Sequence, residues 1–573
     1  MKSPTKHSLG GLPITNRVRG TILHCTRYQT LSKSINLSLF SLFLISPPII
    51  FFTRNIILQE EVNNRLAEEL MQEVRNQIND GIKLQRQLEL IESIDRLGLS
   101  SLFHEEIYRV LSVLSLNNCK EVILCGLRST AICFQLLRRF GFQISEGIFD
   151  DFMDGDHDAF LPTLSDDVIG LLSLYNASYM AFPGEKKMES ARSFAEILPG
   201  SIESAIGHAL DLPLHRRMPW MEARMYIDMY ELEDGMSPAL LHLAKIHFNK
   251  VQSIHQKELK HAGSWWTRLD LGKTISFSRD RLMECFFYVV GIVHHPDYGF
   301  CREKLTQVGM LIATIDDVYD VYGSLEELEL FTQIIDRWDI KGIVELPYYM
   351  KICFSALNDT INGVANHLYL DDRLEAIPYI KRVWADLFKT FLVEAKWHKK
   401  GYIPTLKEYL SNASISISGH VILFNTYILL KCKISKETLQ QLQDFPNIVR
   451  LPSLIFRLCN DLATSSAEQE RGDVSTSIQC YMKETGASEE EARLYISMLI
   501  NDAWNDMNRE YSACSKPQFS QRFIDASINL ARMASFMYQH GDGFSAPSHQ
   551  IKGSIKSLLL NSISNNLYER DMQ

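Results

Sequence analysis

The stretch IDDVYDVYG, residues 315–323, carries three carboxylates within five positions, at Asp316, Asp317 and Asp320. On a helix, residues three and four apart point in broadly the same direction. The apolar run before them, VGMLIATI, predicts a helix drawn into a core, with the acids at the rim of a cavity. Carboxylates this close repel one another unless cations lie between them. Taken alone, the motif is equally typical of a solvated acidic helix end.

A second group of oxygen-bearing side chains lies in FRLCNDLATSSAEQERGD. Asn460, Thr464 and Glu468 follow at intervals of four, so a helix would place their oxygens on one face. Amide, hydroxyl and carboxylate oxygens suit Mg²⁺ or Mn²⁺ and not zinc. An ordinary polar helix surface is the alternative, and the presence of the first motif weakens it. Because phosphate oxygens often complete the shell of Mg²⁺, the two faces predict a diphosphate held between them through metals.

Arginines that could meet a diphosphate from the protein side occur near both motifs. SFSRDRLME contains Arg279 and Arg281, and Arg457 lies about one helical turn before Asn460. The guanidinium fork matches the geometry of phosphate oxygens. An isolated RDR is usually surface charge, and it gains weight only beside the two oxygen-rich motifs.

Together these motifs resemble those of plant class I terpene synthases. IDDVYDVYG, NDLATSSAE, SFSRDRLME, the preceding WWTRLDLG and the later YQHGDGF stand in the family's order at matching separations. The resemblance extends over about residues 60–565 and includes QLELIESIDRLGLSSLFHEEI and LDLPLHRR. It implies an all-α fold of two helical domains, with a C-terminal class I α-bundle enclosing the active site and a vestigial class II-like N-terminal domain. It also implies a prenyl diphosphate substrate and three Mg²⁺ ions, with Mn²⁺ as a substitute.

The resemblance assigns a role to each matching position. The DDxxD metal motif corresponds to Asp316, Asp317 and Asp320, of which the first and last are the more direct ligands. The second metal motif corresponds to Asn460, Thr464 and Glu468. Asp461 lies within it, at a position that usually does not ligate. The arginines expected to bind the diphosphate are Arg279, Arg281 and Arg457. Two residues match positions in a loop that closes over the site, Asp542 and Phe544.

The chemistry implied is ionisation of the substrate. Metals and arginines stabilise the departing diphosphate, which lets the C–O bond break to give an allylic cation. The cation must be shielded from water and stabilised by aromatic faces. The aromatic residues expected to line the pocket are Trp265, Trp266, Phe277, Phe456 and Tyr538. For any one of them, ordinary core packing is the competing explanation.

The sequence departs from the family pattern in two places. Many members that form cyclic monoterpenes carry tandem arginines followed by a tryptophan after the leader, whereas residues 54–62 read RNIILQEEV and the first tryptophan is Trp220. The N-terminal segment that covers the active site in those members is therefore missing or different here. We expect the linear geranyl cation to be quenched before it cyclises, which gives ocimene, myrcene or linalool. Phe277 and Phe456 resemble bulky positions of isoprene-forming relatives, so a five-carbon product is the nearest alternative. The DxDD motif is absent, and DDFMDGDHD at 150–158 is expected to be a loop.

The elements that position these residues are predicted to be helices. In EEVNNRLAEELMQEVRNQI, apolar residues recur every fourth position from Val62 to Ile78, and similar patterns continue nearly to the C-terminus. No sustained alternation predicts strands, so the fold class is all-α. DGMSP at 234–238 predicts a junction between helical domains 60–235 and 236–573. Two loops are expected in the second domain, SNASISISG at 411–419 and HGDGFSAPS at 540–548, the latter as a lid.

Composition excludes several classes of protein. The 573 residues are 46% hydrophobic, enough for large cores, and the 11 cysteines form no CxxC pair, so neither a disulfide framework nor a zinc site is predicted. Residues 1–59 contain seven Lys or Arg and no acid, which leaves 52 basic against 69 acidic residues in the remainder. A body this negative predicts no nucleic-acid partner.

The basic leader, residues 1–59, predicts a plastid transit peptide or an unstructured leader, and hence a stromal protein. Its apolar part, INLSLFSLFLISPPIIFF, leaves a secretory or anchoring segment open, although Pro47 and Pro48 break it and it is short for a membrane span. A mistaken start of the coding sequence would instead make the protein cytoplasmic. No stable membrane partner is expected, and the predicted state is a monomer or weak homodimer.

Rival functions remain open from the sequence. A sesquiterpene synthase would share all the motifs. A chain-elongating prenyltransferase would carry a second DDxxD where this chain has NDLATSSAE. A non-catalytic all-α homologue would require both oxygen-rich faces to be incidental.

Overall fold

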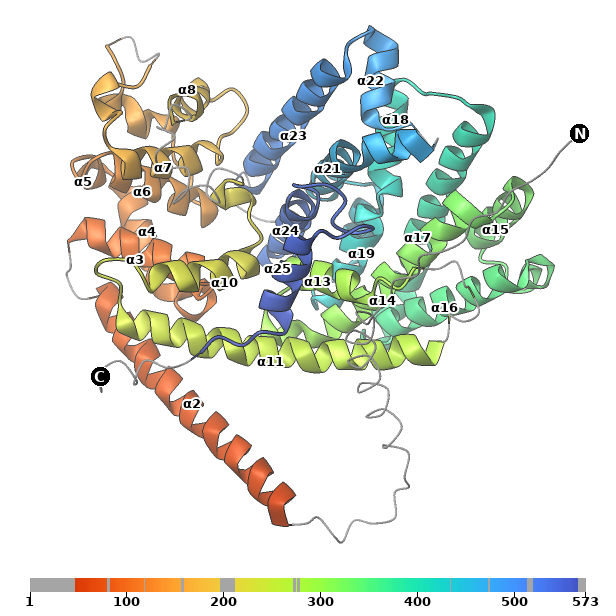
Figure 1. The fold of residues 1–573 in the computed structure, drawn as a ribbon, viewed down its shortest axis with the longest axis horizontal. Coiled ribbons are helices and arrows are strands. Elements are labelled where there is room, and N and C mark those ends of the chain that lie inside the picture. The colour runs from red at the N-terminus through yellow and green to blue at the C-terminus, as the bar shows by residue number, and fades with distance from the viewer. Residues whose placement is uncertain are drawn as a thin grey trace, which may run out of the picture. The chain divides into compact units, whose positions relative to one another are not determined.

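The computed structural model describes residues 47–79, 83–117, 119–155, 159–195, 212–269, 271, 275, 279–432, 434–471, 475–512 and 519–564. The chain forms two units, residues 1–66 and 67–573. Helix α2 (Pro47–Asn79) begins in the first unit, and the second contains every other described element. Within these ranges the regular elements are helical, and the one β-bridge, between Met153 and Phe160, is isolated (Figure 1). The prediction of an all-α fold is confirmed.

The N-terminal helices pack around α6, whose residues are buried on almost every side. Helix α6 contacts α3, α4, α5 and α7, and α7 in turn contacts α8. The helices of this group are α3 (Leu84–Arg96), α4 (His104–Leu116), α5 (Lys120–Ile123), α6 (Leu127–Arg139), α7 (Val168–Ser178), α8 (Lys186–Ala195) and α10 (Pro219–Tyr230). The acidic stretch at 150–158 was expected to be a loop, but its first three residues belong to a 3₁₀ helix, η2 (Glu146–Phe152). Residues 156–158 lie outside the described residues.

A turn separates α10 from the long helix α11 (Pro238–Leu269). Gly235 adopts φ +83°, which a residue with a side chain rarely tolerates, and Pro238 begins the next helix, where a missing N–H costs nothing. The chain break predicted at 234–238 is therefore present as a turn. Its role as the boundary between domains 60–235 and 236–573 stays a prediction.

The C-terminal helices surround the candidate site. Helix α21 packs against α18, α19, α23 and α24, while α14 packs against α13, α16 and α19, and α17 against α15, α18 and α19. These helices are α13 (Leu282–Ile292), α14 (Gly299–Asp317), α15 (Leu325–Arg337), α16 (Tyr348–Ala365), α17 (Leu370–Lys400), α18 (Leu406–Ser416), α19 (Gly419–Leu429), α20 (Lys436–Gln443), α21 (Asn447–Arg471), α22 (Ser477–Thr485), α23 (Glu489–Ser512), α24 (Gln521–Met537) and α25 (His549–Leu559).

The prediction of a loop at 411–419 is wrong, because α18 continues to Ser416 and α19 begins at Gly419. Ser411 and Ser414 donate their hydroxyls to the carbonyls four residues earlier, at 2.8 and 2.7 Å, so they bond within the helix instead of ending it. The break is confined to the two residues between the helices, where Ser418 adopts φ +68°. The stretch 540–548 does lie between helices, as predicted.

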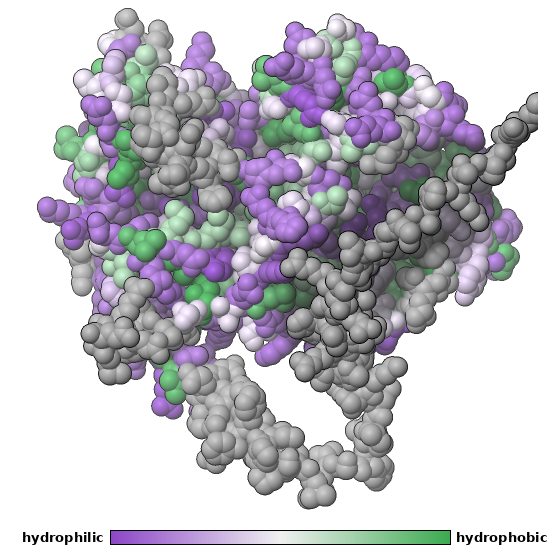
Figure 2. Space-filling view, in the orientation of Figure 1, coloured by the Kyte–Doolittle hydropathy of each residue, from purple (hydrophilic) through white to green (hydrophobic). Residues whose placement is uncertain are grey.

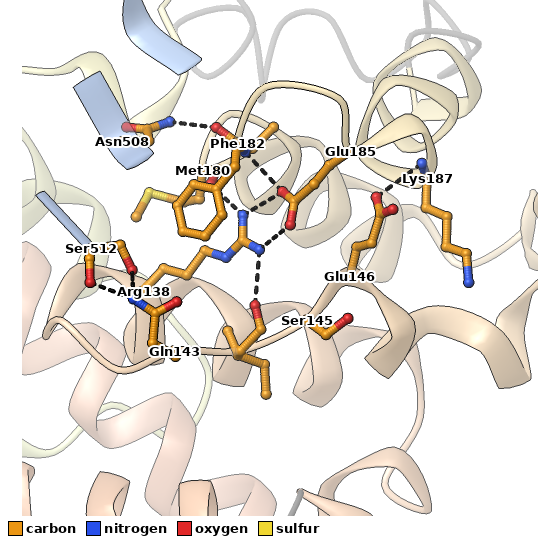
Figure 3. Close-up of polar contacts among 12 residues, drawn as sticks. Arg138, Gln143, Ser145, Glu146, Met180, Phe182, Glu185, Lys187, Asn508 and Ser512 are labelled. Atoms are coloured by element: carbon orange, nitrogen blue, oxygen red, sulfur yellow. Dashed lines mark hydrogen bonds and ion pairs between the residues drawn. The ribbon is translucent and has the colours of Figure 1, made fainter. Parts of the chain in front are cut away.

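Helix α23 makes polar contacts to the N-terminal part of the chain (Figure 3). The Asn508 amide donates to the carbonyls of Tyr179 and Ala181, both at 3.0 Å, and the Gln143 amide donates to the Ser512 hydroxyl at 2.7 Å. Beside them, the Arg138 guanidinium pairs with Glu185. Since α23 also packs on α21, these contacts connect the N-terminal helices to a helix of the candidate site.

The surface shows no large apolar area in the face drawn in Figure 2, where hydrophilic residues predominate among those described and apolar ones are scattered. Among the helices as far as they are described, none combines the length and apolarity needed to span a membrane.

Candidate active site

A cavity of about 1210 Å³ opens among the C-terminal helices. Its wall includes residues of α13, α14, α15, α17, α18, α19 and α21, of the segment after α14 and of the loop after α24. The predicted site residues that line it are Asp316, Asp317, Asp320, Asn460, Thr464, Glu468, Arg279, Arg281, Arg457, Asp542, Phe544, Phe456 and Tyr538. The structure therefore brings the two oxygen-rich motifs, far apart in the sequence, to one cavity.

The three aspartates of the first motif differ in their surroundings. Helix α14 ends at Asp317, and the chain continues as one turn of π-helix, η7 (Val318–Tyr322), which carries Asp320. Asp317 is buried, forms an ion pair with the Arg279 guanidinium and accepts the Arg279 backbone N–H at 3.2 Å. Asp316 lies farther from that guanidinium, at 3.5 Å. Arg279 thus pairs closely with Asp317 and more loosely with Asp316, and no ion pair between described residues engages Asp320.

The cavity holds an excess of negative charge near these residues. Burial raises the pKa of Asp316 to about 6, with Arg279 opposing and Asp317 adding to the shift. Burial, then Asp316 and Glu394, raise the pKa of Asp320 well above its usual value. The Asp320 side chain is open to water within the cavity, and it lies near Asp316 and Glu394, whose negative charges disfavour its ionised form. A divalent cation would remove this repulsion.

Glu394 is a further carboxylate in the cavity wall, on α17. It accepts hydrogen bonds from the Ser416 hydroxyl at 2.6 Å and the Asn412 amide at 3.1 Å, and burial raises its pKa to about 7. No pattern in the sequence predicted that Glu394 belongs to the site. It lies in VEAKWHKK, where no spacing of ligand-type residues distinguishes it from an ordinary charged helix face.

Helix α21 presents the second motif to the cavity. Asn460, Thr464 and Glu468 all line it, and the Thr464 hydroxyl donates to the Asn460 carbonyl at 2.9 Å. Arg457 lines the cavity one turn earlier on the same helix. Asp461 is wholly buried and is not part of the wall. Asn460, Thr464 and Glu468 therefore face the cavity, whereas Asp461, on the same helix, is buried against protein.

The loop between α24 and α25 contacts the two arginines of the RDR motif. Arg279 donates to the Ser545 hydroxyl at 3.2 Å and Arg281 to the Ser545 carbonyl at 2.5 Å. Asp542 accepts the backbone N–H groups of Phe544 and Ser545 at 3.1 and 2.8 Å. Asp542 thus shapes the turn that brings Phe544 to the cavity.

Aromatic residues form another part of the wall. The Tyr288 and Phe456 rings lie 5.4 Å apart, and the Phe456 and Tyr538 rings 6.1 Å apart. The expectation that Trp265 and Trp266 line the pocket is not met: they lie on α11, 5.9 Å from each other, and α13 and α14, against which α11 packs, supply the wall instead. Phe277 lies outside the described residues.

The donors fit a hard divalent cation, since they are carboxylate, amide and hydroxyl oxygens around one space. Within the described residues, no three His, Cys, Asp or Glu side chains are already close enough to hold a metal by themselves. Oxygens from another group would have to complete the coordination shell, as phosphate oxygens commonly do for Mg²⁺.

Two sequence families match the chain, "Terpene synthase, N-terminal domain" over residues 50–205 and "Terpene synthase family, metal binding domain" over residues 267–506. A (-)-alpha-terpineol synthase of Vitis vinifera is 44% identical over 88% of this chain and 87% of its own. A chloroplastic myrcene synthase of Quercus ilex is 43% identical over 88% and 86%. A chloroplastic R-linalool synthase of Artemisia annua is 43% identical over 83% and 86%.

Two solved structures share the fold. Isoprene synthase from grey poplar, in complex with three Mg²⁺ ions and dimethylallyl-S-thiolodiphosphate, superposes with a TM-score of 0.82 at 38% identity over 88% of this chain and 98% of its own. A limonene synthase with 2-fluorolinalyl diphosphate gives 0.83 at 38% identity over 88% and 95%. With its all-α two-domain fold and both family regions, this chain belongs to the terpene synthase family and is a lyase.

Proposed function

We propose that this terpene synthase ionises geranyl diphosphate in a Mg²⁺-dependent reaction and releases a monoterpene and inorganic diphosphate. The observation that carries the proposal is the composition of one cavity, in which ligand-type oxygens and arginines share a wall with apolar and aromatic residues. A prenyl diphosphate has this same division between a charged head and an apolar chain.

At the charged part of the cavity, bound Mg²⁺ would be held by Asp316, Asp320, Asn460, Thr464 and Glu468 and would supply positive charge to the diphosphate. Arg279, Arg281 and Arg457 bind the diphosphate oxygens, because guanidinium groups form charge-assisted pairs with phosphate. The C–O bond then breaks with both electrons leaving on the diphosphate. The main catalytic contribution of these side chains is to stabilise the negative charge on the departing diphosphate.

At the apolar part, the ring faces of Phe456, Tyr538 and Tyr288 stabilise the allylic cation. The loop carrying Phe544 keeps water out. Loss of a proton from the linear cation gives ocimene or myrcene, and capture of one water molecule followed by proton loss gives linalool. We favour an acyclic product because residues 54–62 lack the tandem-arginine pattern. The relatives include both acyclic and cyclic producers by name, myrcene and alpha-terpineol synthases among them.

Isoprene formation from dimethylallyl diphosphate is the second candidate, supported by the likeness to grey poplar isoprene synthase. A sesquiterpene synthase acting on farnesyl diphosphate is a third. Chain elongation is disfavoured because α21 presents Asn460, Thr464 and Glu468 in place of a second DDxxD. Mn²⁺ is proposed as a substitute ion.

The test uses protein lacking residues 1–58, incubated with Mg²⁺ and separately with dimethylallyl, geranyl and farnesyl diphosphate. Gas chromatography with mass spectrometry should find the highest kcat/KM with geranyl diphosphate and a profile dominated by ocimene, myrcene or linalool. Faster turnover of either other substrate would overturn the substrate assignment. A profile dominated by limonene, pinene or another ring compound would overturn the acyclic assignment.

We further propose that residues 1–58 direct the protein to plastids. Their excess of basic residues supports this, as do the chloroplastic names of several relatives. Residues 1–58 fused to a fluorescent reporter should enter plastids. A cytosolic reporter would favour a mistaken start and make farnesyl diphosphate the more plausible natural substrate. The absence of a nucleic-acid or membrane partner and the monomeric or weakly dimeric state stay predictions.

A further inference from the structure

Asp461 lies in the second metal motif, between two cavity-lining residues, yet its side chain is 0% exposed. Successive residues of an α-helix are rotated by about 100° from one another. Asp461 is rotated by about this angle from Asn460, and unlike Asn460 and Thr464 it does not line the cavity. A fully buried carboxylate is costly unless it is paired and hydrogen-bonded, so its partners indicate its purpose.

Both oxygens of Asp461 are occupied by donors. Oδ1 accepts from Arg457 Nε at 2.8 Å and from the Tyr409 hydroxyl at 2.9 Å. Oδ2 accepts from the Ser477 backbone N–H at 3.0 Å and from the same hydroxyl at 3.0 Å. A carboxylate offers about four lone-pair directions. Because the Tyr409 hydroxyl has a single hydrogen to share between the two oxygens, three donors occupy these directions, and the side chain has no exposed surface from which a metal ion could approach.

The contact with Arg457 restrains a guanidinium that lines the cavity. Asp461 engages Nε, and no hydrogen bond to another described residue engages either Nη group. Those groups are left for a ligand in the cavity. Burial by itself would lower the pKa of Arg457, but Asp461, with Tyr409 and the cavity carboxylates, raises it, so the guanidinium stays charged.

The contact with Ser477 fixes the start of α22. Ser477 is the first residue of that helix, where backbone N–H groups lack partners within the helix and favour a negative charge. The two residues before it, Ser475 and Thr476, line the cavity. Tyr409 comes from α18 and lines the cavity as well. One buried carboxylate on α21 thus joins α18, a helix of the cavity wall, to the start of α22, directly after two cavity-lining residues.

We propose that Asp461 is a positioning residue that orients Arg457 toward the diphosphate of the substrate and anchors α18 and α22 to α21, and that it is not a metal ligand. This inference rests on the proposed function, because it presumes that the ligand of Arg457 is a diphosphate.

The test measures binding of inorganic diphosphate in the presence of Mg²⁺ by calorimetry, without turnover. Asp461→Asn should raise the Kd for diphosphate about tenfold, since the amide N–H₂ would face another donor and release Arg457, while the Mg²⁺ half-saturation of activity changes less than about twofold. Glu468→Gln is the matched metal-ligand variant and should show the larger shift in Mg²⁺ half-saturation. A Mg²⁺ shift in Asp461→Asn as large as in Glu468→Gln would overturn the proposal.

A double-mutant cycle shows whether Asp461 acts through Arg457. After Arg457→Ala, adding Asp461→Asn should weaken diphosphate binding by less than about twofold and should raise the melting temperature, because it removes an unpaired buried charge. Fully additive losses would contradict a positioning role.

If Asp461→Asn does not fold, Tyr409→Phe is the alternative variant, because it keeps the pair between Asp461 and Arg457. Tyr409→Phe should raise the Kd for diphosphate less than Arg457→Ala does, and an equal rise would overturn the proposal. A protein that binds diphosphate but forms no terpene would disprove the proposed function and leave the comparison of diphosphate Kd values valid.

Discussion

At the scale of single residues, Asp316 and Asp320 differ from Asp317, which holds the closest contact to the Arg279 guanidinium. Asp316→Asn and Asp320→Asn should each lower kcat more than tenfold and leave the helical circular dichroism unchanged, because they remove charge and no packing. Asp317→Asn is the informative comparison. It should also lower the melting temperature, since it leaves Arg279 without its buried partner. Activity within about threefold of wild type in both of the first two variants would remove the ligand assignment.

Glu468 is the one carboxylate among the three ligand-type residues of α21. Glu468→Gln keeps its shape and removes its charge, so the Mg²⁺ concentration for half-maximal activity should rise about tenfold. Glu470→Gln, at an exposed position on the same helix, is the control and should leave the titration unchanged. The same titration in both variants would show that this face of α21 does not bind metal.

Most residues of the candidate site could be predicted from residue types and their spacing in the sequence. The residues that were missed or wrongly included have physical explanations. The residues at fixed intervals on α14 with η7, and on α21, do reach one cavity, because helical periodicity converts spacing into direction. Glu394 belongs to no interval pattern, and its place in the cavity depends on how α17 packs. Aromatic character predicted Trp265 and Trp266 at the pocket, but aromatic character does not determine which helix face meets the pocket.

At the scale of elements, the loop between α24 and α25 places Phe544 in the cavity wall, with its ring 6.5 Å from that of Tyr288. Phe544→Ala should open this wall to water and raise the share of alcohol in the products at least about twofold, since capture of the cation competes with proton loss. Phe300→Ala is the control, because Phe300 is 39% exposed and is not among the cavity residues. An unchanged ratio of alcohol to hydrocarbon would show that the loop does not exclude water.

Helices were easier to predict than the interruptions between them. Apolar residues at helical intervals predicted an all-α chain because each helix must bury one stripe. Ser and Gly in SNASISISG suggested a loop, but the hydroxyls bond within α18 and the neighbouring Ala413 is buried. Ser and Gly residues indicate where a helix could end, but tertiary packing determines whether it ends there.

At the scale of the whole molecule, three histidines packed around Trp220 should make the protein sensitive to acid. Burial, with neighbouring positive charge, lowers the pKa of His247 to about 4 and of His255 and His294 to about 3. Below pH 6.5 the unfolded chain binds protons that the folded chain does not, so stability present above pH 6.5 is lost as the pH falls. Between pH 7 and pH 5 the loss is about 1–2 kcal/mol per histidine.

Urea unfolding at several pH values measures this effect. The cavity carboxylates, whose pKa values are raised, add stability as the pH falls and so oppose the effect of the histidines. The effect of one histidine is therefore measured by comparing wild type with His255→Gln. The variant should lose less stability between pH 7 and pH 5 by about 1–2 kcal/mol, whatever its stability at pH 7. Equal losses in the two proteins would show that His255 titrates normally in the folded state.

Most contacts between segments far apart in the chain could not be predicted from the sequence. Spacing within IDDVYDVYG and NDLATSSAE predicted two faces, and the need for a shared ligand predicted that they meet. The contacts by which Asn508 and Gln143 connect α23 to the N-terminal helices have no sequence signal, because they join side-chain amides to backbone and hydroxyl oxygens hundreds of positions away.

The most direct test of the central claim, that this cavity ionises a prenyl diphosphate with the help of divalent ions, is the release of inorganic diphosphate from geranyl diphosphate, followed by ³¹P NMR. Wild-type protein with Mg²⁺ should release diphosphate in equal amount to the terpene formed, stop when a chelator is added and resume when Mg²⁺ is restored. Asp316→Asn should release it more than tenfold more slowly. Release that continues in the chelator, or no release from any of the three prenyl diphosphates, would contradict the account.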